Sequence, residues 1–260
     1  MSVRFMSIAS GSKGNCYYVE SEHSRMLVDC GIGIRRVQAA LAEAGVQLAE
    51  IDAIVVSHTH SDHISGLGVL LKHASPVVYC HEQVRNELAR SIRLKRGCDY
   101  DNIQTYDSEH GFPHRDIDIL PCAVSHDADP TCMFKLFCNG HRMGILTDLG
   151  TYGSQQVAVF GDCELLVLES NHCPEILRGN MYPEYLKSRI RSNHGHLSNQ
   201  QAVELSTGLA SMPQHLLLGH LSENSNTPRA ASEAFSRVEV GNIPHTILAQ
   251  HEHSRVLELS

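Results

Sequence analysis

One short segment constrains this chain more than any other: an apolar run that ends abruptly in a cluster of histidines. The run Ile51–Ser57 is rich in isoleucine and valine and predicts a buried strand. The six residues His58 to His63 then read His-Thr-His-Ser-Asp-His, and a helical pattern follows over Ile64–His73. We therefore expect the cluster in the loop at the carboxyl end of a strand, where α/β sheets usually place ligands.

The histidine cluster predicts a metal site. It packs three imidazoles and one carboxylate into six residues, and these groups are the protein ligands that zinc, manganese and iron accept. Side chains two positions apart on an extended turn can share one metal ion while the next pair turns towards a second. A solvated polar loop is the alternative interpretation, and the density of the pattern disfavours it.

Short apolar runs alternate with helical patterns along the rest of the chain, which is typical of an α/β fold. Two layers of sheet with helices outside them account for the number of elements. The chain has 260 residues and lacks tandem repeats, low-complexity tracts and Pro/Gly/Ser linkers, so we expect one domain over residues 1–260.

The expected elements follow from the period of the apolar residues. Strands are expected at Val3–Ile8, Cys16–Glu20, Met26–Asp29, Ile51–Ser57, Val77–Cys80, Ile117–Val124, Cys132–Cys138, Arg142–Thr147, Leu165–Leu168, Leu216–Gly219 and Thr246–Gln250. Helices are expected at Ile34–Ala44, Ile64–His73, Glu82–Leu94, Pro183–Ile190, Asn199–Leu209 and Pro228–Val238.

Composition and charge narrow the function classes. A net charge of −8 argues against binding to nucleic acid or anionic membranes by bulk charge, but a local basic patch could still contact a phosphate backbone. The nine cysteines are odd in number and never spaced as C-x-x-C, so neither a disulfide framework nor a zinc ribbon is indicated. We expect a cytoplasmic protein, because no apolar stretch approaches the ~18 residues of a membrane span. The candidate basic patch comprises Arg90, Arg93, Lys95, Arg96, Arg189 and Arg191.

The segment His58 to His63 matches the H-x-H-x-D-H signature of the metallo-β-lactamase superfamily at every position, and the resemblance extends over nearly the whole chain. It implies an α/β fold of the αββα sandwich type, with two mixed β-sheets flanked by helices. It also implies two divalent metal ions, of zinc, manganese or iron, with a bridging hydroxide as nucleophile. Metal one would take His58, His60, His126 and Asp148, and metal two would take Asp62, His63, Asp148 and His220.

The same resemblance assigns residues beyond the metal ligands. Asp29 would hydrogen-bond the ligand loop from outside the metal sphere. Gly195-His196-Leu197-Ser198 resembles the histidine motif of phosphodiesterase branches, including tRNA 3′-processing ribonucleases, in which the histidine donates a proton to the leaving group. Glu169 would support His196, and Ser198 would cap the next helix. The expected catalytic residues are His196, Glu169 and Asp62, with His194 and His172 as rival proton donors.

Four further segments resemble the YycJ/WalJ-type exonuclease subgroup. They span Ser10 to Asn15, Glu169 to His172, Gly195 to Asn199 and His220 to Asn224. This resemblance implies 5′-to-3′ exonuclease activity, with DNA as the partner and substrate. Cys173 stands where the subgroup would have an aspartate. The substrate contacts that we expect are Ser12, Asn15, Ser198, Asn199 and Asn224.

The sequence also admits alternative ligands and alternative functions. Asp127 and Asp129 are carboxylates that compete with His126 as ligands. A small-molecule hydrolase, acting on a cyclic phosphodiester, a thioester or a lactone, would use the same metals, and the interval from Asp148 to His220 is too short for a large inserted cap domain. A redox di-iron protein is disfavoured, because its second signature histidine is typically glutamate and this chain has His60.

Overall fold

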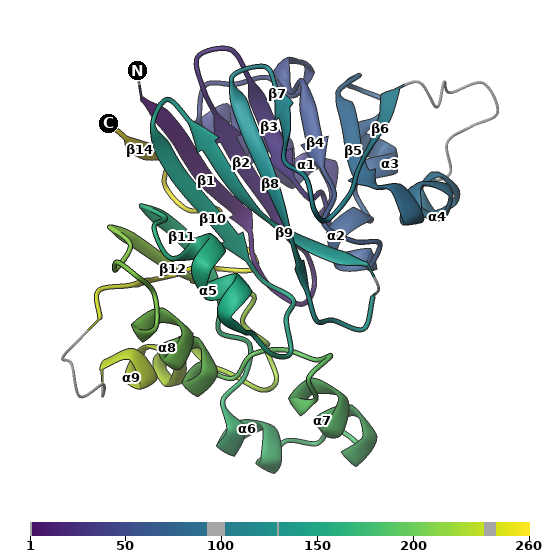
Figure 1. Cartoon of the computed structure of the whole chain (residues 1–260). Helices are drawn as coiled ribbons and strands as arrows, with labels where there is room; N and C mark the ends of the chain where they lie inside the picture. Colours follow the sequence, from purple (N-terminus) through teal and green to yellow (C-terminus); the bar gives the residue numbers. More distant parts are fainter. Residues whose placement is uncertain (1, 93–101, 129, 237–242) are drawn as a thin grey trace.

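A computed structural model describes residues 2–92, 102–128, 130–236 and 243–260, in which two β-sheets lie face to face (Figure 1). Each sheet has seven strands within this part of the chain. No helix among the described residues is long and apolar enough to cross a membrane. Arg93, Lys95, Arg96, Cys98, Asp129 and the last residues of two expected helices lie outside the described residues.

The first sheet is built largely from the N-terminal half of the chain. Its order is β14 (Leu257–Leu259), β1 (Val3–Ala9), β2 (Cys16–Glu20), β3 (Arg25–Val28), β4 (Ala53–Val55), β5 (Val77–His81) and β6 (Ile103–Tyr106). Pairing is antiparallel from β14 to β3 and parallel from β3 to β6. The sheet is therefore mixed.

The second sheet repeats this arrangement in the C-terminal half. Its order is β13 (Thr246–Ile247), β12 (His215–Gly219), β11 (Leu165–Glu169), β10 (His141–Leu146), β9 (Thr131–Cys138), β8 (Ile117–Val124) and β7 (Phe112–His114). Strands β10 to β13 are parallel and strands β7 to β10 are antiparallel. In both sheets, the carboxyl ends of the parallel strands thus point to the candidate site.

Helices cover the outer face of each sheet, and two more stand apart from these layers (Figure 1). The first sheet packs against α1 (Ile34–Glu43), α2 (Ser61–Ile64), α3 (Leu67–Leu70) and α4 (Arg85–Ser91). The second sheet packs against α5 (Ser154–Phe160), α8 (Asn199–Thr207) and α9 (Pro228–Ser236). The projecting helices are α6 (Pro174–Gly179) and α7 (Glu184–Arg191), and short 3-10 turns lie at Leu48–Glu50 and Glu82–Val84.

Three separate apolar layers confirm the expected αββα sandwich. One lies between the sheets and contains Phe5, Tyr17 and Phe134, all fully buried. The other two join each sheet to its helices, for example through Leu41 on α1 and Phe160 on α5. Burial of both faces explains why Leu165–Leu168 in β11 reads as a continuous apolar run, since neither face of this parallel strand meets water.

The expected helix over Ile64–His73 is wrong in detail. The structure has α2 and α3 there, separated at Gly66. The Gly66 amide donates to Cys30 O, and a β-carbon on this glycine would lie 1.9 Å from Ile32 O. The backbone is therefore tied to the segment after β3, which interrupts the helix.

Other boundaries shift where tertiary contacts intervene. Strand β3 ends at Val28 rather than at Asp29, and β4 is shorter than the expected run Ile51–Ser57. The expected helix from Glu82 begins as a 3-10 turn before α4. Sequence patterns missed the short elements α5, α6, β6, β7 and β14.

Candidate metal centre

The expected ligands meet at one end of the two sheets and form two clusters. In the first cluster, ligand atoms of His58, His60 and His126 lie within 4.8 Å of one another. In the second cluster, those of Asp62, His63, Asp148 and His220 do the same. Asp148 lies between the clusters, because its Oδ1 is also 3.9 Å from His126 Nε2.

Three site residues adopt a left-handed backbone conformation directly after a strand. Asp29 follows β3 with φ 60°, Asp148 comes soon after β10 with φ 57°, and His220 follows β12 with φ 53°. They are three of five such non-glycine residues in the described chain. A strained conformation of this kind costs ~1–3 kcal/mol and often re-aims a functional side chain. Here the three side chains converge on the clusters: Asp148 and His220 supply candidate ligand atoms, and Asp29 contacts His63.

Hydrogen bonds fix which ring nitrogen each buried histidine offers. His63 Nδ1 donates to Asp29 Oδ2 at 2.7 Å, and His220 Nδ1 donates to Glu169 Oε1 at 2.8 Å. His126 Nδ1 donates to Gly195 O at 3.1 Å. Each bond turns Nε2 towards its cluster, where this nitrogen can coordinate a metal once it carries no proton; outer partners orient metal-binding histidines in this way.

Asp29 also holds the ligand loop through Ser57. Its Oδ1 accepts from Ser57 N and its Oδ2 from Ser57 Oγ, both at 2.8 Å. Ser57 Oγ in turn lies 3.0 Å from His58 Nδ1. Because that hydroxyl already donates to Asp29, it accepts from His58. The aspartate thus orients His58 as well as His63.

Several buried atoms in the clusters have no hydrogen-bond partner. Among the described residues these include His58 Nε2, Asp148 Oδ2 and His220 Nε2. Buried polar atoms are nearly always hydrogen-bonded or bound to a metal, so a set that points into one space needs an occupant. Divalent cations fit this donor set of imidazole nitrogens and carboxylate oxygens.

The second cluster is strongly polarised by its carboxylates. Burial lowers the pKa of His220, but Asp148 and Glu169 outweigh burial and raise it to about 10. Burial also lowers the pKa of His63, which Asp148 and other carboxylates raise well above its usual value. The second cluster therefore holds protonated histidines until a cation replaces the protons.

The first cluster behaves in the opposite way. Burial, reinforced by the charge on His63, lowers the pKa of His58 well below its usual value. Burial likewise lowers the pKa of His126. His60 is more open, with 34% of its side chain exposed, and its Nδ1 lies 3.3 Å from His126 Nε2. The rings of His58 and His126 are therefore neutral and can coordinate without losing protons.

Glu169, at the end of β11, is the central acceptor of the site and is fully buried. It accepts from both His196 Nδ1 and His220 Nδ1. It also accepts from the backbone amides of Asp148, Leu149 and Leu197. Burial raises its pKa, but the two histidines lower it to about 2, so the carboxylate stays ionised.

His196 lies next to both clusters. Its ring centroid is 5.0 Å from that of His126 and 5.1 Å from that of His220, and its side chain is 19% exposed. The rivals lie differently: His194 is exposed beside Ser125, and His172 is buried, which lowers its pKa to about 4. His196 alone of the three joins the cluster of Asp148, Glu169 and His220.

The expected substrate contacts have varied surroundings. Asn15 is fully buried, and its Nδ2 lies 3.0 Å from His63 Nε2. Ser198 caps α8, as expected, by accepting from Gln201 N. Of the other three residues, Asn199 accepts from Ser170 Oγ at 2.7 Å and Asn224 donates to Tyr182 OH at 2.8 Å. Ser12 lines a pocket.

Asp127, which the sequence offered as an alternative ligand to His126, lies beside the first cluster. His126 belongs to that cluster, so both residues are at the site. Its Oδ1 lies 3.3 Å from His126 Nε2 and 3.7 Å from His60 Nε2. Its other oxygen is paired with Arg189 on α7. The sequence indicated Asp127 only as a competitor of His126, whereas the structure places both residues beside the cluster.

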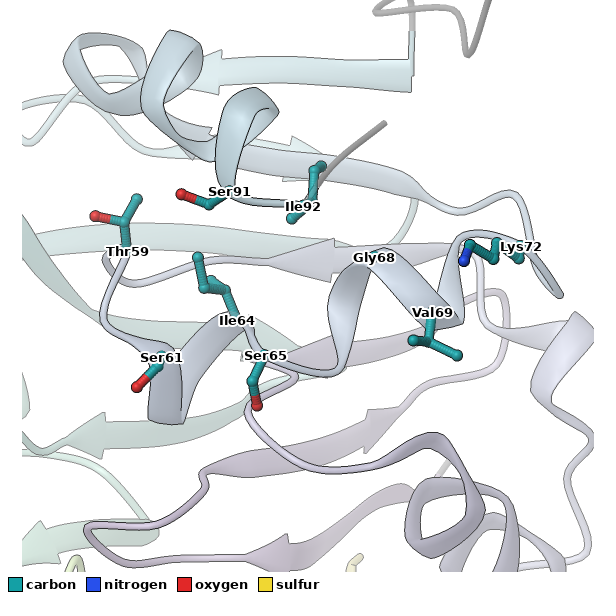
Figure 2. A pocket seen from close by; sticks show the side chains of 9 residues that line it. All are labelled: Thr59, Ser61, Ile64, Ser65, Gly68, Val69, Lys72, Ser91 and Ile92. Carbon is teal, nitrogen blue, oxygen red and sulfur yellow. The ribbon is translucent and has the colours of Figure 1, made fainter. Parts of the chain in front are cut away.

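Two pockets border the ligand residues. An open pocket of about 420 Å³ lies along α2, α3 and the end of α4, with Thr59 and Ser61 at one side and Lys72 at the other (Figure 2). Thr59 and Ser61 alternate in the sequence with the candidate ligands His58, His60 and Asp62. Their side chains line this pocket, whereas those of the ligands point into the clusters. A smaller pocket of about 170 Å³ adjoins Asp127 and His196 beneath α7.

The fold and the two clusters define a metal-binding centre of the metallo-β-lactamase type. Comparison with known families agrees: residues 24–221 match the model described as "Beta-lactamase superfamily domain". The chain belongs to this superfamily. Its fold and its histidine and aspartate clusters together indicate that it binds divalent metal.

Curated relatives are similar over most of the chain. The exodeoxyribonuclease WalJ of Streptococcus pneumoniae is 33% identical over 88% of this chain and 85% of its own length. The exodeoxyribonuclease YycJ of Bacillus anthracis is 32% identical over 92% of this chain and 89% of its own length. The chain thus belongs to the group that includes these two proteins.

Solved structures share the fold at lower identity. The metallo-β-lactamase fold protein YhfI of Bacillus subtilis superposes with a TM-score of 0.74 at 17% identity and full coverage of both chains. The short form of human tRNase Z superposes with a TM-score of 0.64 at 18% identity over 98% of each chain.

Proposed function

We propose that this protein is a metal-dependent exonuclease that digests DNA in the 5′-to-3′ direction and holds two divalent cations. The relatives named as exodeoxyribonucleases support the reaction and the substrate class. The two adjacent clusters support two cations, and their nitrogen and oxygen donors suit zinc, manganese or iron.

In this proposal His58, His60, His126 and Asp148 hold one cation, and Asp62, His63, Asp148 and His220 hold the other. When bound, two divalent cations supply an activated water and stabilise charge on the attacking and leaving oxygens of a phosphodiester. The buried unpartnered atoms in both clusters support this loading. Asp62, with 20% of its side chain exposed, is the ligand of the second cluster that is most open to the substrate.

The observation that carries the phosphodiester assignment is the pair of Glu169 and His196. A sugar oxygen is a poor leaving group and needs a proton, which a histidine oriented by a carboxylate can donate. Glu169 accepts from His196 Nδ1, so the opposite nitrogen, Nε2, is the one free to donate to the substrate. The ionised Glu169 carboxylate stabilises the protonated imidazole that this step requires.

The proposal is tested with purified, metal-loaded protein on linear DNA labelled at the 5′ or the 3′ end. We expect His196→Ala to slow DNA cleavage by ~10²–10⁴-fold, the usual contribution of a general acid. Cleavage of bis(4-nitrophenyl) phosphate should lose much less, because nitrophenolate leaves without a proton. His194→Ala is the matched control and should retain activity. Equal losses on both substrates would remove the proton-donor role.

A further inference from the structure

The small pocket beside His196 suits one end of a DNA strand. It opens onto the first cluster through Asp127, whose carboxylate lies 3.3 Å from His126 Nε2. His196 itself lines the pocket. A group bound here would therefore sit directly beside the expected proton donor and beside the metal ligands.

The pocket has the character of a nucleoside site. One wall is apolar and is formed by Tyr182, Leu186 and Ile190, while Asn171 and Ser222 supply polar groups. Apolar walls with a few placed polar groups are typical of ligand sites, and aromatic rings stack on nucleobases of any sequence. Its volume of about 170 Å³ lies below the ~300–1,000 Å³ of drug-sized sites, so it admits a single small unit.

Hydrogen bonds hold this wall in place against the site. His196 N donates to Ile190 O at 3.0 Å, which ties the proton donor to the end of α7. Tyr182 OH accepts from Asn224 Nδ2 at 2.8 Å. A β-carbon at Gly195 would lie 2.3 Å from Ile190 O, so the loop and helix pack too closely for a side chain there. The pocket is therefore built before any ligand arrives.

The pocket lining includes a cation whose charge is opposite to that of a DNA strand. Arg189 on α7 lines the pocket, is 55% exposed and is paired with Asp127. An arginine in this position can contact a phosphate next to the bound unit while Asp127 holds its guanidinium towards the site.

We infer that this pocket binds the terminal nucleoside of the DNA strand, with the phosphodiester on its 3′ side at the metal clusters. The inference rests on the proposed exonuclease function and adds its binding mode. Water gives one proton to the solvent and adds to the phosphorus as hydroxide, the bond from phosphorus to the 3′ oxygen breaks, and that oxygen takes the proton from His196. His196 then regains a proton from the solvent, so the net reaction consumes one water. The released unit carries a 3′ hydroxyl, and the shortened strand keeps a 5′ phosphate. A pocket for one unit predicts that nucleotides are released one at a time.

Leu186→Trp tests the inference by filling the pocket, with Leu186→Ala as a second variant that enlarges it. Tyr185→Ala is the matched control, because Tyr185 lies on the same helix but is 76% exposed and does not line the pocket. Metal content and thermal unfolding report whether each variant keeps its site and fold. Binding of thymidine 5′-monophosphate and of inorganic phosphate is measured by calorimetry with metal-loaded protein.

We expect Leu186→Trp to weaken nucleotide binding by about tenfold or more, the scale of one lost base contact, and to leave phosphate binding unchanged. The wild type should release mononucleotides from linear DNA and leave circular single-stranded DNA intact, and Leu186→Trp should raise KM for linear DNA. Leu186→Ala should weaken nucleotide binding less than Leu186→Trp, because it leaves the pocket open.

The outcomes separate the two proposals. Unchanged nucleotide binding and KM in a folded, metal-loaded Leu186→Trp would overturn the pocket assignment even if DNA is digested. Cleavage of circular DNA as fast as linear DNA would overturn it too. Loss of nucleotide binding in the variant, with no DNA digestion by the wild type, would support the pocket and overturn the exonuclease function. A wild type that neither binds the nucleotide nor digests DNA would overturn both.

Discussion

The two clusters lie side by side, yet they differ in charge and exposure. The second cluster contains two carboxylates, and its histidines have pKa values raised by those anions. The first cluster consists of three histidines, two of which have lowered pKa values, and His60 is partly open. Because buried anions attract a dication strongly, the second cluster should bind the tighter metal, and the first should hold the one more accessible to substrate.

Asp148 lies between the clusters, so its loss should have the largest effect. We expect Asp148→Ala to lower metal content in both clusters. Its DNA cleavage should fall by more than the ~10²–10³-fold cost of losing one charge-stabilising group. Metal analysis and end-labelled DNA assays measure both, with the exposed Asp107→Ala as control. A variant that kept full metal content would contradict the shared position of this carboxylate.

His220→Ala and His60→Ala compare the clusters directly. Removal of His220 should weaken metal binding by more than the ~10–100-fold cost of losing an outer hydrogen-bond partner. His60→Ala should have a smaller effect, because the ring is open and its cluster has the weaker charge. Chelator competition followed by metal analysis gives both affinities. The reverse order would mean that exposure and charge do not set the difference between the clusters.

The two clusters should also differ in the number of protons that they release when a metal binds, and this is the smallest of the expected effects. His63 and His220 have raised pKa values, so without metal they are protonated at pH 7 and must lose those protons to coordinate. His58 and His126 have lowered pKa values and are already neutral. Calorimetric titration in buffers of different ionisation enthalpy should show about two protons released by the tighter metal and fewer by the other. Equal release would contradict the contrast.

Local sequence patterns were enough to find much of the site. The ligand loop is contiguous from His58 to His63, and its position after an apolar strand placed it at a sheet edge. Asp148 and His220 also follow apolar strands, and the structure brings them to the same edge. Strand patterns are readable because burial on both faces demands continuous apolar residues.

Other features depend on contacts between distant parts of the chain. Gly66 interrupts a helical pattern because its backbone packs on the segment after β3. The pocket beneath α7 forms where a projecting helix meets a loop near the sheet edge. Glu169 orients His220 as well as His196, and nothing in its own motif indicates the second partner.

The sequence by itself thus determined the layers of the fold and predicted the residue types of the candidate metal centre, because periodicity and residue type are local properties. Tertiary structure alone decided which ring nitrogen each histidine offers and how the clusters differ in charge. His220 Nδ1, for example, donates to Glu169 Oε1 across 51 positions of sequence. The left-handed backbone at Asp29, Asp148 and His220 is likewise seen only in the structure, because no residue type in the sequence requires it there.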